Sequence, residues 1–417
     1  MNQTNPSAMR ILVLCPHFAP DTAPTGTVMT RIVAELAHLG HEIHVVTSLP
    51  WYRDHAVAPG WEGSLGRTEH TEWGSVTRLN PFPGNDRSNL LRRAVGFLGF
   101  SLISLVAGFR SGGWFKRVDT VLAMSPPLTL GLTAWALAKA RRGRCVFNIQ
   151  DVFPDAAVRT GAITNPRIIA AAEWLERLTY RRVDAVTALS DGLADNVRAK
   201  LARGRHSSNT EVVVIPNFVD TSALVPGDRM TSYREEFGLG DGPVVMYAGN
   251  LGFSQSLDLV IGLARQRPEL TVVVNGDGSA RASVESAASE LANLHLIGFQ
   301  PADRLSEVLA SADVHLVPLR TGLGDVSVPS KTYSILACGR PVVASIDAGS
   351  AIDVLLTASG GGLRVDPDDL TALVGAVDSL IENPASRAAM GAAGREYVER
   401  EASPIVVGAQ YERVLRG

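Results

Sequence analysis

Residues 244–278 read VVMYAGNLGFSQSLDLVIGLARQRPELTVVVNGDG and contain two apolar runs separated by a helical pattern. We expect strands over 244–248 and 271–275, with a helix near 256–264 between them. A strand, a crossover helix and a second strand form the repeating unit of a parallel sheet. This stretch therefore predicts an α/β fold, and the glycine turn that follows each strand marks where the chain leaves the sheet.

The same alternation continues in both directions along the 417 residues, which exceed the length of one ordinary domain. The segment PNFVD at 216–220 separates two series of strands, so we predict Rossmann-like domains over 9–216 and 217–399. After Asn383 the pattern is helical to the end of the chain. The predicted strands are 11–15, 42–47, 76–79, 120–123, 145–149, 185–188 and 212–215 in the first domain, and 244–248, 271–275, 294–297, 314–317, 342–345 and 363–365 in the second.

The composition limits the classes of function. Hydrophobic residues make up 46% of the chain and the formal net charge is -3, so nucleic acid is not an expected partner. Cys15, Cys145 and Cys338 lie in apolar runs without metal-ligand spacing and are expected to be buried thiols. The first residues show no signal-peptide pattern, which predicts a cytoplasmic location.

An uncharged apolar run, 94–109, is flanked by Arg92, Arg93, Arg110, Lys116 and Arg117. It is short for a transmembrane span and contains internal glycines. Two interpretations remain open: a helix packed in the core, or an interfacial helix that rests on anionic lipid headgroups. The second would make residues 92–117 a peripheral membrane contact.

Open parallel sheets bind ligands beyond the carboxyl ends of their strands, so the loops after the strands are the candidate sites. In the first domain, Gly26 precedes a helical run at 27–39, where a ligand could approach backbone N–H groups. Asp151 follows strand 145–149, where its side chain could point into the cleft. An aspartate that caps a helix or stabilises a turn is an equally good interpretation. His17 in the first loop is expected to be structural.

The second domain offers three glycine turns in consecutive strand–helix units. They begin at Gly249, Gly276 and Gly298, and Asp277 lies inside the second turn. One such turn is common in any α/β protein, because glycine permits tight backbone turns. Three on one rim predict a pocket large enough for a nucleotide.

Lys331 opens a predicted helix in PSKTYSILACGRP at 329–341. Its cation sits where the helix dipole favours an anion, so it is disfavoured there by a few tenths of a kcal/mol unless an anion joins it. The chain has 35 arginines and four lysines, and Lys331 is the only lysine after residue 200. A compact ammonium at a helix start suits a phosphate, so we expect Lys331 to bind a diphosphate.

Several motifs in this order resemble one family. They are GHEIHVV (40–46), NIQDVFPD (148–155), VIPNFVD (214–220), YAGNLGFSQSLDLVI (247–261) and PSKTYSILACGRPVVAS (329–345). Together they are similar to retaining glycosyltransferases of the GT-B fold, of the large family 4 type. Within that family the chain looks most like bacterial enzymes of capsule, O-antigen and colanic acid assembly, including the L-fucosamine transferase type.

The resemblance implies two Rossmann-like domains facing across a cleft, with a terminal helix of about residues 400–417 returning to the first domain. It also implies a nucleotide-sugar donor held by the second domain, and no required metal or other cofactor. Gly26 matches a glycine loop near the donor phosphates, and Asp151 matches a position where many relatives place a histidine near the reacting carbon. Phe299 and Gln300 fall where the family's backbone receives the nucleotide base.

Two departures from the family pattern affect the donor site. Many members hold the diphosphate with an arginine and a lysine where this chain has Asn250 and Gln255. Many also have two glutamates; here the first falls near Asp325 or Val326, and the second at Ser334, which could bind a ribose. The Pro-Ser-Lys helix start, with Ser330, leaves Lys331 as the main cation for phosphate.

The sequence thus predicts a retaining, metal-independent glycosyltransferase with Asp151 and Lys331 in catalytic roles. The expected donor is a UDP-sugar and the expected acceptor is a lipid-diphosphate-linked saccharide in cell-surface polysaccharide synthesis. The protein would then be peripheral on the inner face of the cytoplasmic membrane. The alternatives are a UDP-N-acetylglucosamine 2-epimerase, which acts on the donor alone, and a non-catalytic nucleotide-sugar-binding scaffold.

Overall fold

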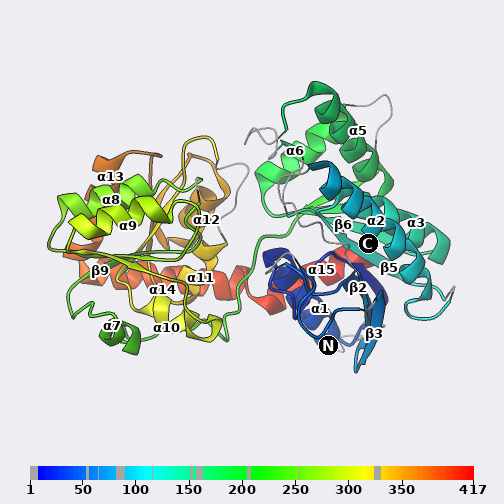
Figure 1. Cartoon of the computed structure of the whole chain (residues 1–417), viewed down its shortest axis with the longest axis horizontal. Helices are drawn as coiled ribbons and strands as arrows, with labels where there is room; N and C mark the ends of the chain where they lie inside the picture. Colours follow the sequence, from blue (N-terminus) through cyan, green and yellow to red (C-terminus); the bar gives the residue numbers. More distant parts are fainter. Residues whose placement is uncertain are drawn as a thin grey trace, which may run out of the picture. The chain divides into compact units, whose positions relative to one another are not determined.

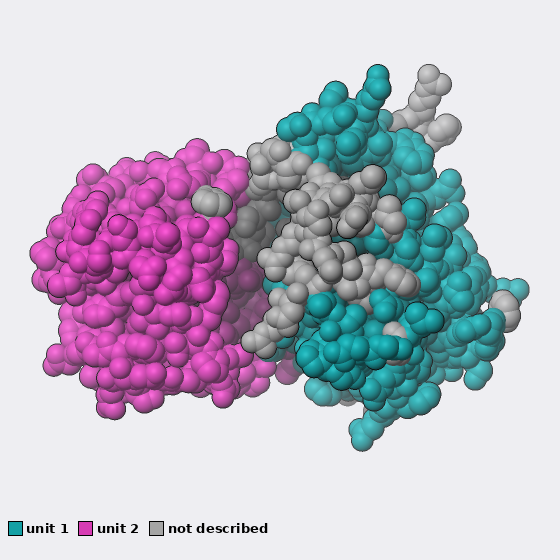
Figure 2. Space-filling model, viewed as in Figure 1, with its two compact units in different colours: residues 1–216, 407–417 teal, residues 217–406 magenta. Residues whose placement is uncertain are grey.

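The computed structural model describes residues 8–52, 56–63, 65–80, 90–114, 116–150, 154–155, 163–203, 208–252, 254–323 and 330–417, and only the backbone of 90–95. The chain forms two compact units, which are coloured separately in Figure 2. Unit 1 comprises Met1–Pro216 together with Val407–Gly417, and unit 2 comprises Asn217–Val406.

Unit 1 is built on an eight-stranded sheet with the strand order β3-β4-β2-β1-β5-β6-β7-β8 (Figure 1). Its strands are β1 (Arg10–Leu14), β2 (Glu42–Ser48), β3 (Gly66–Thr71), β4 (Gly74–Leu79), β5 (Thr120–Met124), β6 (Arg144–Asn148), β7 (Ala185–Ala188) and β8 (Glu211–Val214). All neighbouring pairs are parallel except β3 with β4. Every residue of β5 is buried, as expected for a parallel strand covered on both faces. The seven strands predicted for this half are confirmed, with no end shifted by more than two residues.

Strand β3 was not predicted, and its composition explains why. It pairs antiparallel with β4 in register, with Thr68 opposite Thr77, and forms the sheet edge. Its residues are GRTEHT, most of which are exposed, so they show no alternation of apolar and polar side chains. A polar edge strand of this kind also resists pairing with other chains.

The helices of unit 1 follow the strands as crossover connections. They are α1 (Pro24–His38), α2 (Leu90–Arg110), α3 (Leu128–Arg141), α5 (Pro166–Arg182), α6 (Asp191–Ala202) and most of α15 (Pro404–Arg416). Helix α1 begins at Pro24 and not at residue 27, because proline at the start of a helix costs no backbone hydrogen bond. Cys15 and Cys145 are buried free thiols in this unit, as predicted.

Helix α2 contains the apolar run. Phe100, Ser104 and Ala107 are buried, and the helix packs on α3, so one face belongs to the core. Leu98, Leu102 and Val106 are exposed at a spacing of four residues, which places them along a second face. None of the described helices combines the length and apolar character needed to cross a bilayer. The core interpretation is therefore confirmed for one face of the helix, and contact of the other face with lipid stays a prediction.

Unit 2 has a six-stranded, fully parallel sheet in the order β11-β10-β9-β12-β13-β14 (Figure 1). Its strands are β9 (Val244–Ala248), β10 (Thr271–Asn275), β11 (Leu294–Ile297), β12 (Val314–Pro318), β13 (Val342–Ser345) and β14 (Gly362–Val365). All six match the predicted strands to within one residue. The order reverses between β9 and β12, and such switch points are where open α/β sheets bind ligands.

Two apolar clusters cover the two faces of this sheet. One contains α8 (Leu257–Gln266), α9 (Arg281–Glu290) and α13 (Leu370–Glu382), which lie together on one side in Figure 1. The other contains residues of α7 (Ser232–Glu236), α10 (Leu305–Ala310), α11 (Lys331–Ala337), α12 (Ala351–Ser359) and α14 (Pro384–Glu401). A short 3-10 helix, η1 (Ala302–Arg304), precedes α10. Cys338 is buried in the second cluster, as predicted.

The C-terminal segment returns to unit 1. Asn383 caps α14 by accepting a hydrogen bond from the Ser386 N–H at 3.0 Å, which fixes where the last helical region begins. In α15, the hydroxyl of buried Tyr411 accepts a hydrogen bond of 2.8 Å from Asn148 Nδ2, at the end of β6. The predicted return of the terminal helix is confirmed.

Candidate functional site

Three glycine loops meet at the carboxyl edge of the sheet in unit 2. Gly249 N–H donates to the Asn275 carbonyl oxygen at 2.9 Å, and Gly276 N–H donates to the Ile297 carbonyl oxygen at 2.7 Å. These bonds link the loops that follow β9, β10 and β11 into one continuous rim. The predicted gathering of the three turns on one edge is therefore present.

Two of the glycines are required by this arrangement. A Cβ atom on Gly276 would lie 1.9 Å from the Gly249 carbonyl oxygen, which no side chain can tolerate. Gly249 itself has φ +142°, a conformation that favours glycine. The rim is consequently formed by bare backbone, which leaves space for a ligand to come close.

Lys331 joins this rim from the neighbouring strand–helix unit. It is the first residue of α11 and follows β12, which pairs with β9. Its Nζ lies 3.8 Å from the centroid of the Tyr247 ring. A Cβ on Gly249 would lie 3.1 Å from this Nζ, so the missing side chain at Gly249 makes room for the ammonium. Tyr247 is held in turn by a hydrogen bond of 2.5 Å from its hydroxyl to the Asn250 carbonyl oxygen.

The ammonium of Lys331 has no carboxylate partner among the described residues. Burial lowers the pKa of Lys331 from 10.5 to about 7, because the charged form loses hydration there. The helix dipole disfavours a cation at this position, but the face of the Tyr247 ring stabilises it. The geometry still offers an unneutralised positive charge beside bare backbone, which suits an anionic group.

The predicted donor residues of the first loop lie against each other. The side chains of Asn250 and Gln255 both approach Gly252, whose N–H donates to Gln255 Oε1 at 2.9 Å. Gln255 Oε1 therefore holds the loop, and its amide N–H groups are donors that a phosphate could use. Asn250 is exposed.

The second and third loops carry Asp277, Phe299 and Gln300. Asp277 accepts the Gly278 N–H at 2.7 Å, and Gln300 Nε2 donates to the Gly298 carbonyl oxygen at 3.1 Å, so both side chains fasten their own turns. Phe299 is 60% exposed and presents an aromatic ring to solvent. An exposed ring at a loop tip is available for stacking on a flat ligand.

The two serines predicted for the donor site belong to the start of α11. Ser330 precedes the helix, is exposed, and makes no capping hydrogen bond with its side chain. Ser334 is half-buried and lies three residues after Lys331, hence on the same face of the helix. Their roles in binding the donor stay predictions.

The remaining predicted residues fall elsewhere. Asp151, Asp325 and Val326 lie outside the described residues. Gly26 is inside α1 in unit 1, where a Cβ would lie 2.8 Å from His17 Cβ. Close packing against His17 accounts for this glycine, and the role expected for Gly26 near the donor phosphates stays a prediction.

Tyr247 is the residue that sequence reasoning missed. It is fully buried within a strand of buried residues, so its pattern is that of an ordinary core aromatic. The available signal was its place two residues before Gly249, where the glycine turn begins, which puts its side chain near the end of the strand. Only the fold shows that Lys331, more than 80 residues later, rests on its ring.

Family models match both halves of the chain. Residues 25–217 match a Glycosyl transferase 4-like domain, and residues 230–397 match Glycosyl transferases group 1. The chain is 27% identical to WcaI of Escherichia coli (strain K12), assigned to colanic acid biosynthesis as a glycosyl transferase, over 98% of this chain and 100% of that protein. It is 26% identical to the glycosyltransferase WbjE of Pseudomonas aeruginosa, over 77% of this chain and 85% of that protein.

Solved structures share the fold over nearly the whole chain. The sucrose-phosphate synthase of Thermosynechococcus elongatus superposes with a TM-score of 0.73 at 18% identity, covering 98% of each chain. Alr3699/HepE of Anabaena, in complex with UDP and glucose, superposes with a TM-score of 0.69 at 14% identity, covering 98% of this chain and 99% of that one.

Proposed function

The chain belongs to the glycosyltransferase family that these two domain models describe, with the GT-B fold, and from that premise we propose its reaction. The protein transfers a sugar from a UDP donor to a saccharide carried on a lipid diphosphate, with retention at the anomeric carbon and no required metal. Likeness to a colanic acid glycosyl transferase supports a role in polysaccharide synthesis. A UDP complex of a protein with the same fold supports the donor.

One observation carries the proposal: the Lys331 ammonium lies beside the bare backbone of Gly249 without a described carboxylate. A diphosphate placed there would supply the missing counter-charge. Departure of the nucleotide diphosphate is the difficult step of sugar transfer, since negative charge grows on the leaving oxygen. A cation and the N–H groups at the start of α11 would stabilise that charge without reorganising.

The other groups follow from this assignment. Ser330 and Ser334 would bind the diphosphate and the ribose, and the exposed ring of Phe299 would lie near the base. The departing phosphate would accept the proton of the acceptor hydroxyl on the same face of the sugar, which gives retention. Asp151 would orient the donor sugar or stabilise positive charge at its anomeric carbon.

The test of the function is transfer itself. UDP-glucose, UDP-N-acetylglucosamine and GDP-mannose are offered with a lipid-diphosphate saccharide, in buffer containing a chelator, and the glycolipid product is followed by mass spectrometry. We expect product from a UDP-sugar, and an Asp151→Asn protein that binds UDP normally but transfers at least about tenfold more slowly. UDP binding without any product would favour the scaffold, and conversion of UDP-N-acetylglucosamine without an acceptor would favour the epimerase.

The pH dependence of UDP binding is a second prediction. The pKa of Lys331 is about 7 in the free protein, and an adjacent diphosphate raises it. The contribution of Lys331 to UDP affinity is therefore constant below this pKa and falls as the pH rises above it, by up to about tenfold per unit until the bound-state pKa is reached. Calorimetry at about pH 8, in two buffers of different ionisation enthalpy, should show proton uptake on binding, because Lys331 becomes protonated. The phosphate of UDP titrates near 6 and contributes little to the uptake at this pH. The absence of uptake would mean that Lys331 does not meet the phosphates.

A further inference from the structure

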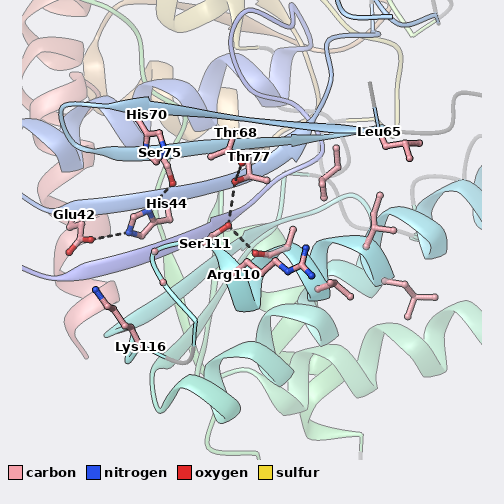
Figure 3. Close-up of a pocket in the computed structure, with 17 residues that line it drawn as sticks. Glu42, His44, Leu65, Thr68, His70, Ser75, Thr77, Arg110, Ser111 and Lys116 are labelled. Atoms are coloured by element: carbon pink, nitrogen blue, oxygen red, sulfur yellow. Dashed lines mark hydrogen bonds and ion pairs between the residues drawn. The ribbon is translucent and has the colours of Figure 1, made fainter. Parts of the chain in front are cut away.

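Unit 1 contains a cavity of about 890 Å³ that the proposed function leaves unused. Helix α2 and the residues just after it form one side, and the strands β2, β3 and β4 form the other (Figure 3). The volume lies in the range of cavities that hold small ligands, roughly 300–1,000 Å³.

The lining of the cavity changes from polar to apolar along its length. Figure 3 shows Glu42, His44, Ser75 and Lys116 at one end and Leu65 at the other. Phenylalanine, tyrosine and tryptophan are absent from the described residues that line the cavity. The apolar part is formed by the aliphatic side chains of Leu65, Leu79, Leu102, Ile103 and Val106. Aliphatic walls without flat rings fit a flexible hydrocarbon chain better than a sugar or a base.

The polar end carries an excess of positive charge. Glu42 is already paired with Arg10 at 2.7 Å and with His44 Nε2 at 3.0 Å, and His44 Nδ1 lies 2.9 Å from Ser75 Oγ. Lys116 lies at this end and has no ion pair among the described residues. Arg110, which stacks on Trp114 at 4.9 Å, lies farther along the cavity (Figure 3). An ammonium without a carboxylate partner complements an anionic head group.

We propose that this cavity binds a phosphate-bearing lipid, with its hydrocarbon chain along α2 and its phosphate at Lys116. Leu102 and Val106 are 58% and 55% exposed, so water covers apolar surface that such a chain would remove from solvent. β2 begins at Glu42 and β4 begins just before Ser75, so the phosphate lies toward the amino end of these parallel strands. The bound lipid is thus separate from the saccharide that reacts at the carboxyl edge.

The experiment measures binding of dodecyl phosphate, below its micellar concentration, to the full chain by calorimetry. Dodecyl maltoside presents the same chain with an uncharged head, and inorganic phosphate presents the head alone. We expect dodecyl phosphate to bind at least about tenfold more tightly than either, because the site contacts both the hydrocarbon chain and the phosphate. Equal binding of dodecyl maltoside would overturn the phosphate assignment.

Variants with matched controls locate the site. Val106→Glu should weaken dodecyl phosphate binding about tenfold or more, and Lys116→Ala several-fold. Ile168→Glu is the control for an exposed apolar residue of unit 1, and Lys139→Ala is the control for an exposed lysine of the same unit. Neither control should change binding, and an equal loss in the controls would overturn the site. All four changes are at exposed positions, and thermal melting verifies that each protein folds.

Two further outcomes separate this inference from other accounts. A protein that floats with anionic phospholipid vesicles but does not bind dodecyl phosphate would contradict the cavity site and leave α2 as a membrane-surface contact. Val106→Glu should keep wild-type UDP affinity. If the wild type binds dodecyl phosphate but not UDP, the proposed function fails while the lipid site stands.

Discussion

Replacing Lys331 with methionine is expected to weaken UDP binding about a hundredfold, because a charge-assisted contact with the diphosphate contributes on the order of 2–3 kcal/mol. Methionine keeps most of the apolar stem against the Tyr247 ring and removes only the charge. Calorimetry at about pH 6, below the pKa of Lys331, gives the largest difference, since the lysine is then protonated before UDP binds.

The stability of the same variant distinguishes a binding role from a structural one. Because the native state lowers the pKa of Lys331 to about 7, the unfolded chain binds more protons between that pH and 10.5. The lysine therefore costs stability below its unfolded pKa, and this cost is complete below about 7. We expect Lys331→Met to melt at the wild-type temperature or higher at neutral pH. Lys139→Met, at an exposed lysine of α3, should change neither melting nor UDP affinity.

Gly276→Ala is expected to destabilise unit 2 by about 3 kcal/mol and to abolish tight UDP binding. The added methyl group would lie 1.9 Å from the Gly249 carbonyl oxygen, and the hydrogen bond from Gly276 N–H to Ile297 holds the loop in place. The rim must therefore separate, which moves Gly249 away from Lys331. Urea denaturation followed by circular dichroism measures the stability; all six tryptophans lie in unit 1, so their fluorescence reports on that unit instead.

Gly375→Ala provides the control for this substitution. Gly375 lies within α13, and a Cβ there would meet no atom within 4 Å. Alanine in a helix is favoured over glycine by up to about 1 kcal/mol, so the control should be neutral or slightly stabilising. Wild-type stability and UDP affinity in Gly276→Ala would contradict the described rim.

The core of the fold was predictable because buried parallel strands have a strong signal. β9 is a continuous apolar run and β10 has three consecutive valines, each strand is followed by a glycine, and the predicted bounds of both agree with the structure. β3 was not predictable, because GRTEHT is polar and its strand conformation depends on pairing with β4. Tertiary pairing of this kind overrides what a short polar segment prefers by itself.

The candidate site was predictable in its residue types but not in its contacts. Glycine turns and a lysine at a helix start are visible in sequence, and the parallel order brings them to one edge. The support of Lys331 by Tyr247 depends on β9 and β12 being neighbours although they are far apart in the chain. Gly26 shows the opposite case, because a loop glycine that suggested ligand access serves to pack His17.

The most direct measurement is the protonation of Lys331 itself, followed by NMR of the lysine side chains with and without UDP. The chain has only four lysines, and Lys331→Met identifies the signal. We predict a pKa near 7 in the free protein, and a rise of at least about one unit when UDP is bound, as expected for an ammonium beside a diphosphate. An identical titration of Lys331 in the free and UDP-saturated protein would contradict its role at the leaving phosphate.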